Sequence, residues 1–329
     1  MPLKAFSRQP SALNLQPSTF SLSSYVPAWK ELPLLSDLFH RIRNRFLVPA
    51  CLINSLPKSG THLLKKVVGF FPGMHPVDFH LGPRHFNLEM HSRMDSLPGE
   101  HSPTMIPVGV GRPRMVPREE VYRALKQYVT QGSYATAHVP FSTGLALVLK
   151  KLKIKMVTIV RDPRDVVVSH AKYISSLPPD NFQFGTPLHV YYQSLSEGER
   201  LMTSMVGVRK EPNGPVLLNI RDRLESVLLW GSQPFNFTTT FERLVGPQGG
   251  GSRERQVQEI RAISRHLRTG YSDREIEAVA DRLFGGTATF RKGVIGGWKE
   301  HFTEEHKQVC KKLIGRLLID LGYEKDDEW

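Results

Sequence analysis

The chain has 329 residues, of which 40% are hydrophobic and 23% are charged, and its net charge is +13 at pH 7. This is the composition of a globular protein, and the length suits one large α/β domain or two small ones. The positive charge favours an anionic partner, such as a nucleotide, an acidic glycan, a nucleic acid or a membrane surface, but it does not choose among them.

Cysteine content and hydropathy argue against a disulfide-stabilised protein and against a membrane-spanning one. Two cysteines, Cys51 in a predicted strand and Cys310 in a predicted helix, are too few for a disulfide framework, so we expect a reducing compartment and a cytoplasmic location. The longest apolar stretch, at residues 46–56, contains Pro49 and Asn54, and no stretch reaches the length of a transmembrane helix.

The first 46 residues form an extension that differs from the rest of the chain. Residues 1–30 are rich in Ser, Pro, Leu and Gln, and the first acidic residue is Glu31. A Ser-rich, acid-free start is also typical of an organelle transit peptide, but we prefer a loosely ordered extension because chain termini are often untethered. Residues 36–46 predict a short amphipathic helix.

The next elements begin with a strand and a helix. Apolar residues predict a strand within 46–56, and helical apolar spacing follows the turn at 57–61. Residues 72–118 are rich in Pro, Gly and His, so we expect long loops with functional content. Residues 117–130 predict a helix, and residues 133–141 predict a short strand.

Residues 155–174 hold the clearest pair of elements. Residues 156–160 predict a buried strand, Asp162 is placed to cap a helix, and Pro163 occupies the first helical position. Ser142 can cap an earlier helix in the same way. Because the strand-turn-helix order recurs, we expect an α/β fold of three layers, a P-loop-like arrangement in which helices flank a mostly parallel central sheet.

The C-terminal half is predicted to be mostly helical. A strand leading into a helix is expected at 236–244, and helices are expected within 186–232, at 253–268, at 272–284 and from Thr303 to about Gly322. Glycine-rich loops are predicted at 246–253 and 289–299.

The turn Pro57-Lys58-Ser59-Gly60-Thr61 has the features of a phosphate-binding loop. Small residues let an anion approach, backbone N–H groups can point at it, and a helix N-terminus follows. The Walker pattern GxxxxGK[ST] is absent, because Lys58 precedes the glycine, and this disfavours a nucleoside-triphosphate kinase or ATPase. On its own, the turn is equally consistent with an ordinary strand-helix connection.

Two further segments carry cations at places suited to an anion. Arg161 lies at the end of a predicted strand, where side chains reach the ligand crevice of an open α/β sheet, and Ser169 lies about two helical turns further on. An arginine and a hydroxyl can hold one phosphate from two sides. Arg291 and Lys292, followed by Gly293, suit a doubly charged phosphate group. Taken alone, the Arg161 segment is better explained by surface ion pairs at a helix start, and the Arg291 segment is also consistent with a solvated basic loop.

In this order, the segments PKSGT, RDPRDVVVS and FRKGxxGxWKxxFT resemble the soluble, cytosolic-type sulfotransferases, which use 3′-phosphoadenosine 5′-phosphosulfate (PAPS). The resemblance covers roughly residues 47–325, and it implies a sulfotransferase domain over that range with a C-terminal tail at 326–329. It further implies PAPS as the co-substrate, no metal, and transfer of a sulfuryl group to an acceptor hydroxyl or amine.

The resemblance implies that the first turn holds the 5′-phosphosulfate. Lys58 matches the lysine whose ammonium lies on the oxygen that bridges phosphate and sulfate. The residues that match the backbone wrapping of this group are Ser59, Gly60, Thr61 and His62.

The other two motifs are implied to hold the 3′-phosphate, which distinguishes PAPS from ATP. Arg161 and Ser169 match the family's arginine and serine for this group. Arg291, Lys292 and Gly293 match its second clamp. Several charge-assisted hydrogen bonds are needed to hold a dianion, which explains why two clamps are present.

The family carries its catalytic histidine at the end of a short strand, and the matching segment here reads Thr136-Ala137-His138-Val139-Pro140. His138 is therefore the candidate base. A neutral histidine is suited to accept the proton of an acceptor alcohol near pH 7, and Lys58 would stabilise charge on the leaving phosphate. The implied reaction is a direct in-line transfer in which positioning and electrostatics dominate.

Three positions depart from the family pattern. Thr136 stands where the family often has a lysine, and Leu63 stands where it often has a tryptophan stacked on adenine. Phe241 replaces the tyrosine of a Tyr-Glu-Asp segment that borders adenine, so we expect this ring at the nucleotide without its hydroxyl. The phosphate motifs are kept while the adenine contacts change, as in a distant branch of the family.

Three other interpretations stay open. A P-loop kinase or nucleotide hydrolase would need a GK pair and a carboxylate on a second strand, and neither is evident. A non-catalytic protein that binds nucleic acid would carry basic stretches with interleaved aromatics, whereas the cations here are spread, so no nucleic-acid partner is expected. A non-catalytic protein of the PAPS fold is the third, although His138 and Lys58 argue against it.

The acceptor's class and the oligomeric state are not readable from the sequence, and a homo-oligomer is compatible with it. We expect the acceptor to meet residues 72–118 and 175–190. The first of these ranges contains five histidines, His75, His80, His85, His91 and His101. Their spacing matches no tight ligand pattern, so no metal site is expected.

Overall fold

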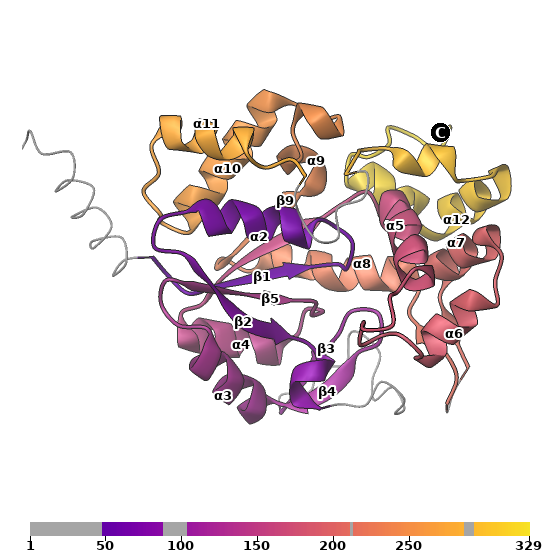
Figure 1. Ribbon diagram of the computed structural model, residues 1–329, viewed down its shortest axis with the longest axis horizontal. Coiled ribbons are helices and arrows are strands. Elements are labelled where there is room, and N and C mark those ends of the chain that lie inside the picture. Colours follow the sequence, from indigo (N-terminus) through magenta and orange to yellow (C-terminus); the bar gives the residue numbers. More distant parts are fainter. Residues whose placement is uncertain (1–47, 88–103, 211–212, 286–292) are drawn as a thin grey trace, which may run out of the picture. The chain divides into compact units, whose positions relative to one another are not determined.

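The computed structural model describes residues 48–87, 104–210, 213–285 and 293–329 (Figure 1). Its centre is a sheet of five parallel strands in the order β2-β5-β1-β6-β9. The strands are β1 (Cys51–Ser55), β2 (His75–Leu81), β5 (Ser133–Ala137), β6 (Lys155–Val160) and β9 (Asn236–Thr240). The predicted α/β fold with a parallel central sheet is confirmed.

Helices cover both faces of this sheet, as Figure 1 shows. On one face lie α2 (Thr61–Phe70), α10 (Arg253–His266) and α11 (Asp273–Asp281). On the other face lie α3 (Arg118–Tyr128) and α4 (Thr143–Leu152).

The alternation of side chains along the strands explains the two layers. Leu52 of β1 packs with Ala135 into the core beneath α3 and α4, whereas the next residue, Ile53, packs with Val157 into the core beneath α2 and α10. Successive side chains of a strand point to opposite faces, and strands that are buried on both faces are therefore mostly apolar along their whole length.

A third helical group packs beyond the end of the sheet, around Trp298. It comprises α5 (Pro163–Ser175), α6 (Pro187–Gln193), α7 (Glu197–Val206), α8 (Ile220–Leu228) and α12 (Glu304–Asp320). The short helix α9 (Phe241–Leu244) follows β9 directly. Two small hairpins complete the elements, β3 (Met105–Val108) with β4 (Arg114–Pro117) and β7 (Val208–Arg209) with β8 (Val216–Leu217).

The helix starts that the sequence predicts are confirmed at three positions. The Ser142 side chain accepts the N–H of Leu145 at 3.2 Å, and Asp162 accepts the N–H of Arg164 at 2.9 Å. Thr303 caps α12. Each cap satisfies a backbone donor that has no partner inside its helix.

The prediction of long loops over residues 72–118 is wrong in part. Residues His75–Leu81 form β2, an edge strand of the main sheet, and the β3–β4 hairpin lies in the same range. Val77, Phe79 and Leu81 alternate inward with period two, but the polar residues between them and Pro76 conceal the pattern. A proline is tolerated there because β2 is at an edge of the sheet.

Three further expectations concern the cysteines, membrane-spanning helices and the N-terminal extension. Cys51 and Cys310 are both buried free cysteines. No helix of the described segments has the length and apolar character needed to cross a bilayer. The expected helix at 36–46 and the rest of the N-terminal extension lie outside the described residues.

Candidate active site

A pocket of about 550 Å³ opens at the carboxyl ends of the parallel strands. Four residues that directly follow a strand line it, namely Gly82 after β2, His138 after β5, Arg161 after β6 and Phe241 after β9. The turn after β1 supplies a fifth wall. Ligands of open α/β sheets bind at this edge, because the connections diverge there and leave a crevice.

The turn between β1 and α2 is held in an uncommon backbone conformation. Lys58 has φ of 74° and Gly60 has φ of 102°, and the N–H of Ser59 donates to the Leu56 carbonyl at 3.1 Å. A Cβ at Gly60 would lie 2.9 Å from Cδ2 of Phe241, so glycine is required both for its φ and for this close approach. The turn thereby keeps the N-terminus of α2 open toward the pocket.

The other predicted residues of the turn also reach the pocket. Lys58, Thr61 and the exposed His62 line it, and Lys58 Nζ lies 4.0 Å from the centroid of the Tyr173 ring on α5. Ser59 is fully buried, and its Oγ has no hydrogen-bond partner among the described residues. A buried hydroxyl without a partner marks a place where a ligand oxygen would be accommodated.

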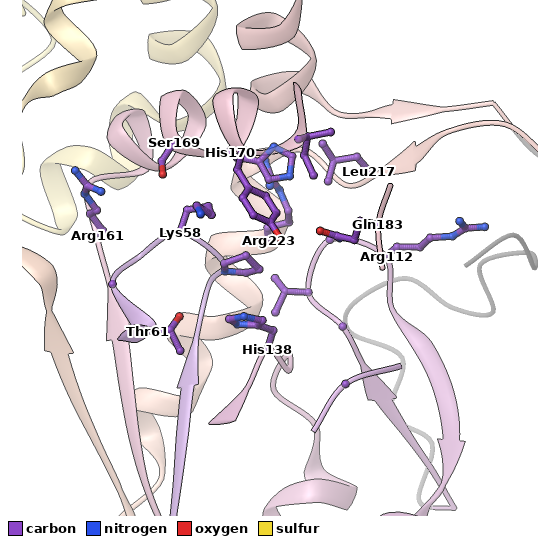
Figure 2. A pocket seen from close by; sticks show the side chains of 18 of the residues that line it. Lys58, Thr61, Arg112, His138, Arg161, Ser169, His170, Gln183, Leu217 and Arg223 are labelled. Atoms are coloured by element: carbon purple, nitrogen blue, oxygen red, sulfur yellow. The ribbon is translucent and has the colours of Figure 1, made fainter. Parts of the chain in front are cut away.

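Arg161 and Ser169 line the same pocket from the end of β6 and from α5. Arg161 Nη2 donates to the Val294 carbonyl at 2.7 Å and pairs with Asp165 at 3.3 Å, and its guanidinium lies 4.2 Å from the Phe241 ring centroid. Figure 2 shows Arg161 and Ser169 at one end of the pocket, with Lys58 between them and the rest of the site.

Asp165 connects the third motif to this end of the pocket. Its carboxylate accepts the backbone N–H of Gly296 and of Trp298, both at 2.9 Å. Gly293 lines the pocket, whereas Arg291 and Lys292 lie outside the described residues. The described part of the third motif, from Gly293 to Trp298, therefore lies beside the start of α5 and next to Arg161.

His138 has a defined orientation. Its Nδ1 lies 3.0 Å from the Ser55 carbonyl oxygen and 3.1 Å from Ser55 Oγ, which in turn lies 2.6 Å from Thr61 Oγ1. A carbonyl can only accept, so Nδ1 carries the proton and Nε2 is left with its lone pair. Burial, together with the neighbouring His80, lowers the pKa of His138 to about 3. The imidazole is therefore neutral at physiological pH.

His80 lies beside His138 and was missed by the sequence analysis as a site residue. The two ring centroids are 4.9 Å apart, His80 Nδ1 lies 2.9 Å from Thr136 Oγ1, and both side chains line the pocket. Burial lowers the pKa of His80 to about 4. The available signal was its position in an alternating run just before the end of a strand, which the surrounding Pro and His residues obscured. The hydroxyl of Thr136, where the family often has a lysine, therefore has His80 as its hydrogen-bond partner.

Arg164 of the second motif has a structural place outside the pocket. Its guanidinium is buried, pairs with Asp162 at 2.7 Å and with Glu324, and lies between the rings of Trp298 and Trp329. Arg164 therefore connects α5 to the C-terminal residues, whereas Arg161 faces the pocket. The view of this motif as exposed surface pairs is wrong, because both arginines are largely buried.

Metal ligation has no support in the described ranges. No three His, Cys, Asp or Glu side chains within them gather closely enough to hold a metal ion. His85 instead packs edge-on against Phe79, and His91 and His101 lie outside the described residues.

Comparison with known proteins supports the resemblance seen in the motifs. Residues 49–206 match the model of the sulfotransferase domain family, so the resemblance is confirmed over that segment. The fold is similar to that of mouse sulfotransferase SULT7A1 complexed with PAP, with a TM-score of 0.52, 17% identity, and 84% of this chain and 87% of that chain covered.

A second solved structure, retinol dehydratase in complex with androsterone and inactive cofactor PAP, matches with a TM-score of 0.45 and 14% identity, covering 86% of each chain. No curated protein sequence matches the chain.

Proposed function

We propose that this protein is a PAPS-dependent sulfotransferase that transfers a sulfuryl group to an acceptor hydroxyl or amine. The observation that carries the proposal is that three segments far apart in sequence, the turn at Lys58, the Arg161–Ser169 pair and His138, line a single pocket at the carboxyl ends of the strands. The mouse SULT7A1 structure contains PAP, the product nucleotide, and we carry that ligand class over to this pocket.

The turn after β1 would hold the 5′-phosphosulfate. The backbone N–H groups of Ser59, Gly60, Thr61 and His62 lie at the start of α2, where the helix dipole favours an anion. Lys58 would leave the Tyr173 ring to meet the oxygen that bridges phosphate and sulfate. The buried Ser59 Oγ would gain a partner in the same group.

The 3′-phosphate would lie between Arg161 and Ser169. Arg161 Nε is buried and has no hydrogen-bond partner among the described residues, so the guanidinium has capacity for an anion beyond Val294 and Asp165. Arg291 and Lys292, with the backbone of Gly293, would supply the second clamp. The proposed domain therefore extends past the matched segment, to about residue 325.

The adenine would contact Phe241 and Leu63. Both line the pocket, and Phe241 is already packed against Gly60 and Arg161. This ring and an aliphatic side chain would take over the stacking that a tryptophan provides elsewhere in the family.

In the proposed reaction, His138 acts as the base and Lys58 stabilises the leaving group. Nε2 of His138 accepts the proton of the acceptor hydroxyl while the acceptor oxygen forms a bond to sulfur. The bond between sulfur and the bridging phosphate oxygen breaks, and the ammonium of Lys58 stabilises the charge that develops on that oxygen. The products are the sulfated acceptor, 3′,5′-ADP and a proton that His138 releases to solvent.

An acceptor-dependent assay tests this proposal. PAPS is incubated with the protein and a panel of phenols, aliphatic alcohols and amines, and 3′,5′-ADP formation is measured by chromatography. We expect acceptor-dependent turnover that falls by roughly 100-fold or more in His138→Ala and in Lys58→Met. Turnover of PAPS that does not depend on His138, or use of ATP with Mg²⁺ in place of PAPS, would overturn the assignment.

A further inference from the structure

The end of the pocket beyond His138 contains a buried cation that the proposed nucleotide site does not use. Figure 2 shows Arg161 and Ser169 at one end, and Gln183, Leu217 and Arg112 toward the other, with Lys58 and His138 between. Arg223, on α8, lines the pocket in this second half and is only 2% exposed.

The guanidinium of Arg223 is held by neutral groups only. Nε donates to the Asn219 carbonyl at 3.3 Å, and Nη2 donates to the Ser204 carbonyl. The neighbouring acid, Asp222, accepts a hydrogen bond from Asn219, and its charge acts on Arg223 without a direct hydrogen bond between the two side chains. A guanidinium has five N–H donors, so most of them stay available to a ligand.

Carboxylates are scarce around this cation. Among the described residues that line the pocket, Asp165 is the single carboxylate, and it accepts two backbone N–H groups beside Arg161. A buried cation loses most of its hydration, so an anion that enters this end of the pocket and pairs with it is favoured. Burial lowers the pKa of Arg223 to about 10, and the side chain stays charged at neutral pH.

A second donor lies next to Arg223. His170 on α5 is buried and lines the pocket, its Nδ1 lies 2.9 Å from Ser204 Oγ, and Ser204 Oγ lies 2.8 Å from the Tyr192 hydroxyl. When Tyr192 donates to Ser204 and Ser204 donates to Nδ1, Nε2 of His170 carries the proton and can donate to an anion. Arg112 lines the same end of the pocket, so an anion held by Arg223 and His170 has a further cation within the same half of the site.

We infer that the acceptor is an organic acid, with a carboxylate held by Arg223 and His170 and a hydroxyl presented to His138. The inference rests on the proposed function, which it narrows to a substrate class. The lining of the pocket also includes the apolar side chains Val168, Ile174 and Leu217, which suits an acid with an apolar body.

Matched acid and amide probes test the inference by calorimetry, with and without 3′,5′-ADP. The pairs are para-hydroxyphenylacetate with its primary amide, and a long-chain ω-hydroxy acid with its primary amide. We expect the wild-type protein to prefer at least one acid over its amide by roughly 10- to 100-fold. If no acid binds more tightly than its amide, the inference is overturned, and a phosphonate analogue that binds better than both acids overturns the carboxylate assignment.

Three variants locate the site. Arg223→Gln keeps donors for the two carbonyls but removes the charge, and it should abolish the preference for the acid. Gln183→Glu places a negative charge, like that of the acid probe, at the same end of the pocket with little change in side-chain volume. It should weaken binding of the acid and leave binding of the amide unchanged. Arg221→Gln on the same helix removes an exposed arginine that pairs with Glu225, and it should leave the preference unchanged.

The outcomes separate this inference from the proposed function. If 3′,5′-ADP fails to bind while the acid preference is lost in both Arg223→Gln and Gln183→Glu, the anion site stands and the sulfotransferase proposal fails. If 3′,5′-ADP binds and neither variant changes the acid preference, the proposed function stands and the role of Arg223 is overturned. Should Arg223→Gln not fold, Gln183→Glu alone decides between these results.

Discussion

At the scale of single residues, the site is organised around a histidine that cannot easily be protonated. The Ser55 carbonyl directs Nε2 of His138 toward the pocket, and burial beside His80 keeps the imidazole neutral. A base of this kind is ready to accept a proton at any physiological pH, although it is weak until the acceptor and the anionic co-substrate change its surroundings.

The first prediction concerns the pH dependence of activity. Because kcat/KM reports groups of the free enzyme and the pKa of His138 is about 3, we expect no loss of kcat/KM from its protonation between about pH 5 and 8. An ordinary histidine would produce an acid limb near pH 6.5. The pH profile of 3′,5′-ADP formation checks this, and a limb near that value would show that His138 titrates normally.

The second prediction concerns stability in acid. In the unfolded chain His138 and His80 titrate near the ordinary value of about 6.5, whereas in the folded protein their pKa values are about 3 and about 4. Between those limits the unfolded state binds more protons, so the free energy of unfolding decreases as the pH falls below about 6.5. His138 contributes a slope of about 1.4 kcal/mol per pH unit, whereas His80 contributes less because its side chain is exposed and water screens its charge.

Urea unfolding of the wild type, His80→Gln and His138→Gln across this pH range measures the two slopes. His138→Gln should lose the slope of about one proton, and His80→Gln should lose a smaller part of it because His80 is exposed. An equal slope in the wild type and His138→Gln would contradict a lowered pKa for His138.

At the scale of elements, the turn between β1 and α2 is positioned by packing as well as by its own sequence. Gly60→Ala should cost about 1–2 kcal/mol of stability, because the new side chain meets both a positive φ and the Phe241 ring. It should also weaken 3′,5′-ADP binding. The double variant Gly60→Ala/Phe241→Leu should recover part of the stability by removing the ring, and calorimetric unfolding measures both. No recovery would indicate that backbone strain alone decides the cost.

The contact of α5 with the third motif leads to a further prediction. Asp165→Asn exchanges an acceptor oxygen for a donor facing a backbone N–H, and it removes the ion pair with Arg161. We expect a cost of about 1–3 kcal/mol in stability and a weaker affinity for 3′,5′-ADP. Asp273→Asn, which changes an exposed acid at the start of α11, is the matched control and should change neither. Unchanged nucleotide affinity in Asp165→Asn would show that this contact does not contribute to nucleotide binding.

Local signals in the sequence were enough for elements with strong periodicity and caps. The strand before Arg161, the Asp162 cap and the last helix follow from short-range patterns, and the structure contains all three. Strand β2 could not be predicted, because its inward alternation is interrupted by a proline and histidines that only an edge position allows. His80 and Arg223 were missed for a related reason, since tertiary packing and not sequence spacing brings them to the pocket.

At the scale of the whole described domain, the parallel direction of the strands explains why the residues of the pocket lie close together. Residues that follow four different strands meet at one edge because all five strands run in the same direction. The motifs proposed to hold phosphate were predictable because each belongs to one loop, whereas the proposed acceptor half includes residues of α5, α8 and the β7–β8 hairpin, where no sequence motif is evident. Cations line both halves of the pocket, and we propose Arg161 and Lys58 for the nucleotide and Arg223 for the acceptor.

Calorimetric binding of 3′,5′-ADP and of 5′-ADP, in the wild type and in Arg161→Ala, tests whether the pocket recognises the 3′-phosphate of PAPS. We expect 3′,5′-ADP to bind roughly 100-fold more tightly than 5′-ADP, because the 3′-phosphate gains charge-assisted hydrogen bonds. We expect Arg161→Ala to remove most of this difference. Equal affinity for the two nucleotides in the wild type, or a preference that survives in Arg161→Ala, would contradict this recognition.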